Sequence, residues 1–317
     1  MKKSLIALAA LAAVSAASAQ STLTISGSVA GAFERQSTAG AKTGITGYDA
    51  SSNNITFKGV EDLGGGLKAG FELNKRFNTA TGNTAGSTSN NAREFENSSL
   101  FLESAKLGKL SMGRMLSTSW ASYDPFGGLG TDMSLDSTGV NTSTGTVNYA
   151  YNAIVGSRKD SMLAYASPVY SGFKLSLATT LNPSVNTGKE YIFGRIDYSN
   201  GPLNLSAAQD KSATLVGVAQ VTNKQVAGSY DFGFVKTALV WGKAGATAAR
   251  TSVHATVPVN ASVNLLASYR TKGAALNTSY ALGADYLLSK RTTAFAHYGD
   301  SDNNAQAAYR IGVRHTF

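Results

Sequence analysis

The side chains that could catalyse a reaction are few in this chain and lie far apart along it. The histidines are His254, His297 and His315, and the chain has no cysteine. A serine hydrolase needs a histidine held between a serine and an acid, and these histidines would meet such partners only by chance. Cysteine nucleophiles and cysteine-based metal sites are excluded. We therefore expect no catalytic residue and no cofactor.

One short motif begins like a metal-binding loop but lacks the residues that would complete it. The series Asp300-x-Asp302-x-Asn304 starts like an EF-hand calcium loop, yet its sixth position is Ala305 and its twelfth is Ile311. An EF-hand needs glycine and glutamate at those places. We predict no metal site of this kind, although loop carboxylates could still bind a cation at the surface.

The remaining chemistry is electrostatic and resides in charged residues scattered singly along the chain. Lysine and arginine number 28 against 19 acidic residues, a formal net charge of +9. A nucleic-acid-binding surface would gather its basic residues into a dense patch, so we expect no nucleic-acid partner. A polar cavity lined by unpaired positive charges would instead attract small anions.

These charges alternate with apolar residues at the period of a β-strand. In residues 308–317, Tyr309, Ile311 and Val313 share one face, and Arg310 and Arg314 share the other. Successive side chains of a strand point to opposite faces. The same sorting places nine basic and four acidic residues on polar faces along the chain. The basic residues are Lys58, Arg76, Arg158, Lys174, Arg195, Lys236, Arg270, Arg310 and Arg314, and the acidic ones are Glu34, Glu72, Asp197 and Asp285.

The alternation predicts sixteen strands joined by seven short turns and eight longer loops. The expected strands are 22–34, 53–59, 67–76, 95–104, 109–114, 158–166, 172–181, 190–199, 202–209, 223–231, 233–243, 250–257, 261–270, 277–287, 291–299 and 306–317. The strand at 95–104 is the least regular, because Ser98 to Glu103 do not alternate cleanly. An even number of strands, short turns at one rim and long loops at the other are typical of a transmembrane barrel.

Composition favours the same fold class. Only 43% of the residues are hydrophobic, glycine is frequent and proline is rare. A soluble protein of this length would bury a large aliphatic core, whereas a barrel with a wet lumen needs apolar residues on one face only. Aromatic residues also gather near the expected strand ends, as the two interfaces of a membrane require. They are Tyr165, Tyr198, Tyr230, Tyr286 and Phe317 near the short turns, and Trp241, Tyr269 and Tyr298 near the long loops.

The first residues have the features of a secretory signal peptide. Lys2 and Lys3 precede an apolar run from Leu5 to Val14, and Ala17-Ser18-Ala19 is a small-x-small cleavage signal. The run is shorter than the roughly 20 residues that span a bilayer. We expect residues 1–19 to be removed and residues 20–317 to form a single barrel domain.

One connection, Met115 to Ser157, is much longer than the others. Connections of this length are often functional, and in a wide barrel such a loop can fold inward and narrow the lumen. We expect its acids Asp124, Asp132 and Asp136 to face a basic wall across the constriction, although each could instead cap a turn. The candidates for that wall are Lys58, Arg76, Arg93 and Arg114. Arg114 has outward parity, so an inward position would require a β-bulge.

The remaining inward charges line the lumen under this interpretation. They include Glu72, Arg158, Lys174, Arg195, Arg270, Arg310 and Arg314. Each basic residue could lie at the constriction, in the wider vestibule, or at a strand end beside the headgroups. The excess of bases over acids favours anions.

Several motifs resemble the Gram-negative porins of beta-proteobacteria, and they occur in order from end to end. They are NNITFKGVEDLGGGLKAGFEL at 53–73, Gly113-Arg114, Asp124-Pro125-Phe126-Gly127, YSNGPL at 198–203, YDFG at 230–233, GADYLLSKRT at 283–292 and GVRHTF at 312–317. The resemblance implies a homotrimer of sixteen-stranded antiparallel barrels in the outer membrane, each with an inward third loop. It also implies passive diffusion of small hydrophilic solutes and inorganic anions, contact with lipid and lipopolysaccharide, and recognition of Phe317 by the barrel-assembly machinery.

The chain departs from the family where selectivity would be set. Relatives often carry arginine where this chain has Asn53 and Asn54, and again where it has Ala164. The resemblance therefore implies only weak anion selectivity. A channel selective for organic acids or sugars is an alternative, but a file of lumen aromatics would be needed, and parity turns only Phe193 and Phe295 inward. A non-conducting barrel enzyme or adhesin is a second alternative.

Overall fold

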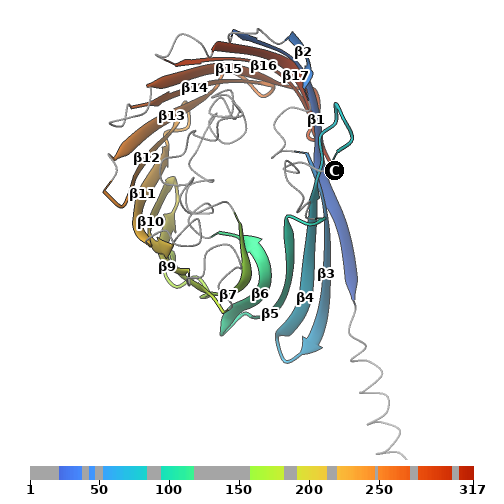
Figure 1. The fold of residues 1–317 in the computed structure, drawn as a ribbon, viewed down its shortest axis with the longest axis vertical. Helices are drawn as coiled ribbons and strands as arrows, with labels where there is room; N and C mark the ends of the chain where they lie inside the picture. The colour runs from blue at the N-terminus through green and yellow to red at the C-terminus, as the bar shows by residue number, and fades with distance from the viewer. Residues whose placement is uncertain are drawn as a thin grey trace, which may run out of the picture.

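A computed structural model describes residues 21–37, 43–46, 53–83, 94–117, 158–181, 191–212, 220–246, 249–271, 278–301 and 307–317. These residues form antiparallel strands and the turns between them (Figure 1). The strands are β1 Thr22–Ser37, β2 Thr43–Thr46, β3 Asn54–Gly64, β4 Leu67–Arg76, β5 Asn97–Ser104, β6 Gly108–Leu116, β7 Arg158–Ala166, β8 Phe173–Thr180, β9 Ile192–Asn200, β10 Leu203–Ser212, β11 Val221–Asp231, β12 Lys236–Ala244, β13 Arg250–Pro258, β14 Val263–Arg270, β15 Ser279–Leu287, β16 Thr292–Ser301 and β17 Ala307–Thr316. No helix in the described part of the chain is long and apolar enough to span a bilayer.

The sheet closes on itself to form a sixteen-stranded barrel. From β3 onward each strand pairs with its neighbour in the chain, and β17 returns to pair with β1 between Ser28 and Ser37. The short strand β2 pairs with β1 from Ala32 to Arg35, while β3 pairs with β1 from Thr22 to Ser28. Because β2 and β3 share one position in the ring, the closed barrel has the sixteen positions expected from the sequence, and only the separate β2 was missed.

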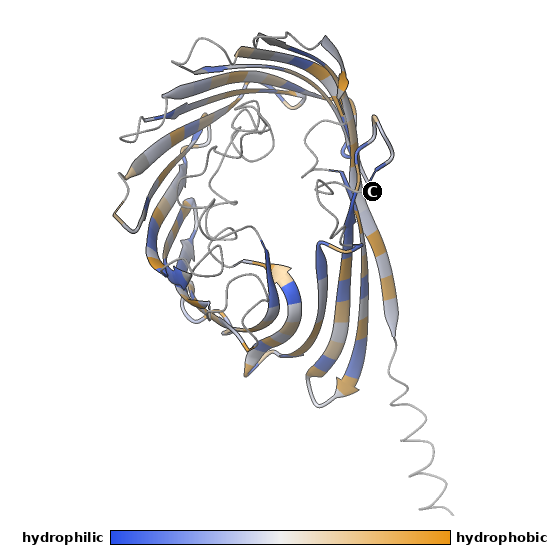
Figure 2. Ribbon diagram, viewed as in Figure 1, coloured by the Kyte–Doolittle hydropathy of each residue, from blue (hydrophilic) through white to orange (hydrophobic). Residues whose placement is uncertain are grey.

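The two faces of the wall differ in polarity, as Figure 2 shows by the alternating colours along the strands. On β11, Asn223, Gln225 and Ser229 are buried on the inner face, whereas Val226 and Tyr230 are exposed on the outer face. Neighbouring strands continue these faces through their registers, so the outer face carries a band of apolar residues around the ring. Such a wall can stand between lipid and a wet lumen, which is the arrangement that permits half of each strand to be polar.

The aromatic residues expected near the strand ends lie on the outer face. Tyr230 and Tyr286 are exposed at the short-turn rim, and Tyr269 is exposed at the long-loop rim. At the short-turn rim the rings of Tyr230 and Phe232 lie 4.6 Å apart, and those of Phe173 and Tyr198 do likewise. The two aromatic girdles mark the levels of the two membrane interfaces.

The DLGGGL motif forms the tight turn between β3 and β4. Gly64, Gly65 and Gly66 all have positive φ, between 62° and 83°. Side chains other than glycine rarely adopt this conformation, and the Asp62 carboxylate accepts a hydrogen bond from Gly64 N at 2.9 Å. The three glycines therefore reverse the chain within a few residues.

A single side chain bridges the gap that β2 and β3 leave along β1. The amide of Asn53 is fully buried; it accepts a hydrogen bond from Ala30 N at 2.6 Å and donates to Ala30 O at 3.2 Å. The Thr79 hydroxyl also donates to Ala30 O at 2.6 Å. Ala30 lies between the residues of β1 that pair with β3 and those that pair with β2. The Asn53 amide thus replaces the missing strand backbone.

We predict that Asn53→Ala lowers the free energy of unfolding by about 1–3 kcal/mol, because the buried N–H and C=O of Ala30 both lose a partner. Urea unfolding of the barrel in detergent, followed by tryptophan fluorescence, measures the change. The matched control is Asn200→Ala at an exposed turn, which should change stability by less than about 0.5 kcal/mol. Equal effects of the two substitutions would contradict the bridging role.

Candidate functional site

The inner face of the barrel gathers charged residues from strands far apart in the sequence. In the wall formed by β3–β6, called the first wall below, the strand register places Lys58 opposite Glu72, Glu72 opposite Ser99, and Ser99 opposite Gly113. The remaining registers extend this face around the ring. Of the residues proposed for the lumen or its basic wall, those with inner-face registers are Lys58, Glu72, Arg76, Lys174, Arg195, Arg270, Arg310 and Arg314.

Two lysines on this face share one aromatic ring. The ammonium of Lys109 lies 4.0 Å from the centre of the Phe101 ring, and that of Lys58 lies 5.9 Å from it. Neither ammonium has a carboxylate oxygen within 4.0 Å among the described residues. A cation over an aromatic face is stabilised without losing its charge, so both lysines keep a field that reaches into the lumen.

Phe101 is held in place by a glycine on the neighbouring strand. Phe101 is paired with Gly70, and a Cβ atom on Gly70 would lie 2.4 Å from the ring. The ring therefore lies flat against the wall, where it is 6% exposed. The same arrangement recurs between β16 and β17, where the Phe295 ring lies against Gly312.

The basic residues of β17, on the other side of β1, have acidic partners. Arg310 Nε donates to Glu34 in a buried pair between β17 and β1. Asp285 on β15 accepts from His297 at 2.7 Å and lies 4.0 Å from Arg314. These pairs cancel much of the charge that the arginines would otherwise present, so the wall at β15–β17 contributes less positive potential than its composition indicates.

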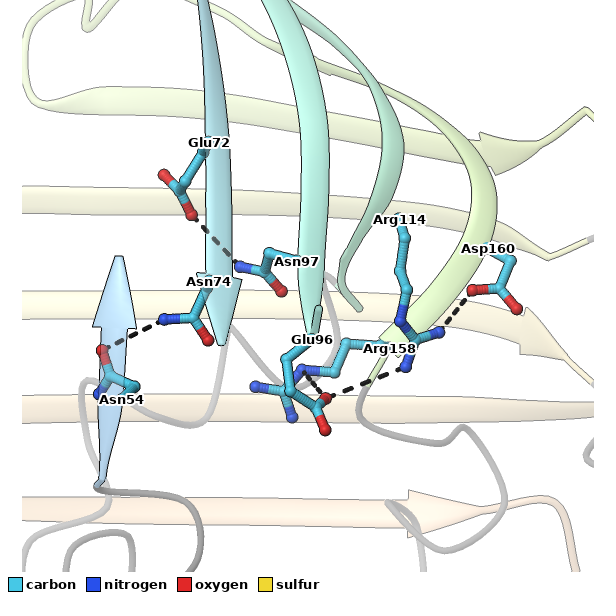
Figure 3. Close-up of polar contacts among 8 residues, drawn as sticks. All are labelled: Asn54, Glu72, Asn74, Glu96, Asn97, Arg114, Arg158 and Asp160. Atoms are coloured by element: carbon cyan, nitrogen blue, oxygen red, sulfur yellow. Dashed lines mark hydrogen bonds and ion pairs between the residues drawn. The ribbon is translucent and has the colours of Figure 1, made fainter. Parts of the chain in front are cut away.

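Amides replace charges towards the long-loop ends of β3–β5 (Figure 3). Asn74 donates to Asn54 at 3.2 Å and to Thr56 at 2.7 Å, and Asn97 donates to Glu72 at 3.3 Å. The two asparagines at 53 and 54 therefore serve different roles. Asn53 completes the wall, and Asn54 faces the lumen as a neutral polar group.

A β-bulge changes the position of two predicted arginines. The register slips between Gly113 and Met115, so that Arg114 opposes both Asp160 and Ser161 of β7, and Ser161 has positive φ. The extra residue belongs to β7. Arg114 therefore remains on the outer face, contrary to the inward position expected for it.

The same slip moves Arg158 away from the inner face that simple alternation assigns to it. Beyond the bulge Lys159 faces inward, with its ammonium 5.3 Å from the centre of the Tyr191 ring. Its neighbour Arg158 points outward and contacts Glu96 at 3.1 Å. Arg114 bonds Asp160 at 2.5 Å and lies 3.9 Å from Glu96, which completes an ion-pair network on the outer wall (Figure 3).

The histidines do not form a catalytic triad among the described residues. His254 contacts the Ser252 hydroxyl at 3.1 Å, whereas the histidine with an acidic partner is His297. His315 contacts Thr292 on the outer face. The described residues also contain no cluster of His, Cys, Asp or Glu suited to a metal ion.

Several predicted residues lie outside the described ranges. They are Arg93 and the acids Asp124, Asp132 and Asp136 of the long connection, together with the proposed signal peptide at 1–19. The inward fold of the third loop thus remains an expectation.

Four inner-face residues were missed by sequence reasoning. Phe101 was not singled out because the strand at 95–104 did not alternate cleanly, and the face of Lys159 depends on the bulge. Lys109 was overlooked, although the parity that turns Arg114 outward turns Lys109 inward. Tyr191 precedes β9 and joins Met162, Ala178 and Phe193 in a buried apolar cluster on the inner wall. The register that places Phe101 opposite Gly70 would have indicated that Lys58 and Lys109 lie over the Phe101 ring. Only the folded sheet supplies that register.

Comparison with known proteins identifies the family. The family model described as Gram-negative porin matches residues 7–306. The chain belongs to the Gram-negative porins. This porin is 31% identical over 252 residues to outer membrane porin protein 32 of Delftia acidovorans, covering 74% of this chain and 68% of the relative. It is 26% identical over 335 residues to an outer membrane porin protein of Bordetella pertussis, covering 82% of this chain and 81% of that relative.

Solved structures share the fold of this porin. An anion-selective porin from Comamonas acidovorans superposes with a TM-score of 0.71 at 22% identity, covering 94% of this chain and all of the other. OmpF of Salmonella typhi superposes with a TM-score of 0.68 at 15% identity, covering 93% and 97%. The protein is thus an outer-membrane β-barrel channel for passive diffusion, and members of the family are channels rather than enzymes.

One ion pair at the long-loop rim can be tested by titration. Lys75 donates to Glu94 at 2.6 Å, and this hydrogen bond, together with the positive charge of Lys75, lowers the pKa of Glu94 below its ordinary value of 4.5. Because the folded-state pKa is lowered, the pair stabilises the fold above about pH 4.5 and the stabilisation is lost as the pH falls through the folded value.

We predict that Lys75→Gln raises the pKa of Glu94 towards 4.5. Carbon NMR of the labelled glutamate side chains measures the titration. Lys68→Gln, at the other end of the same strand, is the control and should leave the Glu94 titration unchanged. If the pKa of Glu94 is unchanged by Lys75→Gln, another group lowers it.

Proposed function

We propose that this porin is a weakly anion-selective diffusion channel for inorganic anions and other small hydrophilic solutes. The observation that carries the proposal is the pair of ammonium groups of Lys58 and Lys109, which face the lumen over Phe101 without a carboxylate within 4.0 Å among the described residues. A low-dielectric wall focuses the field of such charges across the aqueous path. The anion selectivity ascribed to the Comamonas acidovorans porin, which shares this fold, supports the same direction.

The selectivity is weak because neutral and acidic groups share this wall. Asn54 and Ala164 occupy positions where arginine would strengthen the positive field, and Glu72 and Glu103 lie on the inner face beside the lysines in register. Opposite charges within a Debye length of about 8 Å offset one another at physiological salt. The net field therefore favours anions without excluding cations.

We further propose that residues 115–157 fold into the lumen and set its width. In this arrangement Asp124, Asp132 and Asp136 face Lys58 and Arg76, and the transverse field orients polar solutes as they pass. Arg93 would join the basic wall from the end of the second long loop. The lumen face of Arg76, paired with Asn54 in register, supports its place in this wall.

A homotrimer is proposed for the assembled protein, exported by the signal peptide at 1–19. One structural neighbour, OmpT of Vibrio cholerae, is described as a trimer form; it superposes with a TM-score of 0.66. The outer wall of β1–β6 also has an apolar hollow of about 660 Å³, lined by residues that include Leu23, Phe71, Leu100 and Met112. A second copy would cover this hollow, whereas the lipopolysaccharide and lipid of the outer membrane would cover the rest of the outer face.

A solute-specific channel is less well supported. More aromatic rings face the lumen than alternation predicted, namely Phe101, Tyr191, Phe193 and Phe295. They lie on β5, β9 and β16 or beside them, and Tyr191 and Phe193 are buried in an apolar cluster. Among the described residues they do not form the continuous file along which a sugar or an organic acid would slide.

We predict that Lys58→Glu or Arg76→Glu lowers the chloride-to-potassium permeability ratio severalfold, because each reverses a charge on the inner wall. Reversal potentials in a salt gradient across a planar bilayer measure the ratio. Lys290→Glu in a short turn is the control and should leave the ratio close to that of the unaltered protein.

The same recordings test the rest of the proposal. A trimer of open channels gives conductance in steps of three that rises with salt without saturation. Saturation by one solute would favour the specific channel, and the absence of current would favour a non-conducting barrel. If the reversal potential does not move with either substitution, the two residues lie away from the constriction.

Phe317 is proposed as the signal that the barrel-assembly machinery recognises. Its backbone also pairs with Gly27 of β1, at 3.0 and 3.1 Å, and its ring lies beside that glycine. The residue could therefore act in assembly, in sealing the seam between β17 and β1, or in both.

We predict that Phe317→Ala strongly reduces the amount of protein in the outer membrane of cells, while refolding of the purified chain into detergent changes little. Heat-modifiable migration on gels measures the folded fraction in both cases. Phe234→Ala in an exposed short turn is the control for loss of an aromatic. An equal loss in cells and in purified refolding would assign Phe317 to the seam alone.

A further inference from the structure

Three lysines gather on the outer face at the long-loop ends of β10, β11 and β12. Lys211, Lys224 and Lys243 each share the outer face of their strand with exposed apolar residues such as Val226 and Leu239. In the register, Lys224 lies directly opposite Lys243, and Lys211 lies opposite the neighbouring Thr222. The three ammonium groups therefore occupy one patch of the outer wall.

Within the part of the wall that the structure describes, no acidic side chain offsets the charge of this patch. Like charges directly opposite each other in a sheet are destabilising, and the outer-face positions of the described parts of β9–β13 carry no aspartate or glutamate. No carboxylate lies within 4.0 Å of these three ammonium groups among the described residues. Elsewhere on the outer wall near the same rim, Lys75 is paired with Glu94 and Arg114 with Asp160. An anion from outside the protein would remove the repulsion.

The level of the patch in the membrane identifies the source of that anion. Trp241 lies on the outer face two residues below Lys243 and opposite Val226. Tryptophan concentrates where the apolar core of a bilayer meets its headgroups. The lysines, one step farther towards the long loops, thus lie at the level of the headgroups, where each cation attracts anionic lipid.

We propose that Lys211, Lys224 and Lys243 form a binding site for the phosphate of an anionic lipid headgroup in the outer leaflet. Three ammonium groups supply the hydrogen-bond donors that a phosphate accepts, and the acyl chain of the same lipid lies along Val226, Leu239 and Trp241. The site rests on the location of the barrel in the outer membrane and is independent of the ion selectivity of the lumen.

Trp241 provides a reporter within the site. The chain has two tryptophans, so Trp120→Phe leaves Trp241 as the single fluorophore. The protein is reconstituted into phosphatidylcholine vesicles that contain a small fraction of brominated phosphatidylglycerol or brominated phosphatidylcholine, and quenching of Trp241 is compared. We expect the anionic lipid to quench at a fraction up to about a hundredfold lower than the zwitterionic lipid, because each of the three lysines near the surface favours an anionic lipid by about fivefold.

In the double variant Lys224→Gln, Lys243→Gln this preference should fall to about fivefold, because Lys211 alone remains. The control variant, Lys106→Gln with Lys290→Gln, removes two lysines from short turns at the opposite rim and should retain the preference. Heat-modifiable migration confirms that each variant is folded. Reversal potentials recorded from the same preparations report on the lumen separately, so failure of the lipid site and failure of anion selectivity are distinguishable.

Two results would overturn the proposal. The first is equal quenching by the two brominated lipids in the parent, or a preference in the Lys224–Lys243 variant as large as that of the parent. The second is loss of the preference when inorganic phosphate replaces chloride at matched ionic strength, because the site would then be one for the free ion rather than for a lipid.

Discussion

The structure depends on the need to satisfy every backbone N–H and C=O inside a bilayer, where no water is present to do so. A flat sheet would leave two edges unpaired in lipid, and the ring of registers from β3 to β17 and back to β1 removes both. The few places where the ladder is interrupted have replacements. The Asn53 amide satisfies Ala30 between β2 and β3, and the terminal Phe317 backbone pairs with Gly27 below the last residues of β17.

Because the barrel is closed, each strand has one face towards lipid and one face towards the water-filled lumen. Apolar and polar side chains therefore alternate along each strand. The outer face carries exposed apolar residues bounded by aromatic girdles, and the inner face carries amides, hydroxyls and charges. Glycine has a specific part in this wall. Gly70 and Gly312 admit the rings of Phe101 and Phe295, which then lie flat instead of filling the lumen. The ammonium groups of Lys58 and Lys109 lie over the Phe101 ring, and we attribute the preference for anions to these two lysines.

Charge in the lumen is distributed unevenly around the ring. The arginines of β17 have partners on β1 and β15, so their positive charge is partly cancelled, while Lys58 and Lys109 on β3 and β6 keep theirs. A count of basic residues on the inner face therefore overstates the field at β15–β17 and understates the importance of the first wall. On the outer face the same comparison separates the paired charges of β4–β7 from the lysines of β10–β12, which have no acidic partner among the described residues. We therefore propose that an external anion binds these lysines.

Period-two alternation and turn composition were sufficient to predict the barrel, the number of positions in it and nearly all strand bounds, because a membrane wall allows only one polarity on each face. The DLGGGL turn and the outward aromatics were evident for the same local reason. What the sequence could not supply is any property that arises between strands. The short β2, the bulge that turns Arg158 outward, the ring of Phe101 under two lysines and the pairing of Arg310 with Glu34 all depend on register. Register is set by closure of the whole ring, which brings together residues hundreds of positions apart, such as Arg310 and Glu34. These contacts between strands determine which charges have an opposite partner.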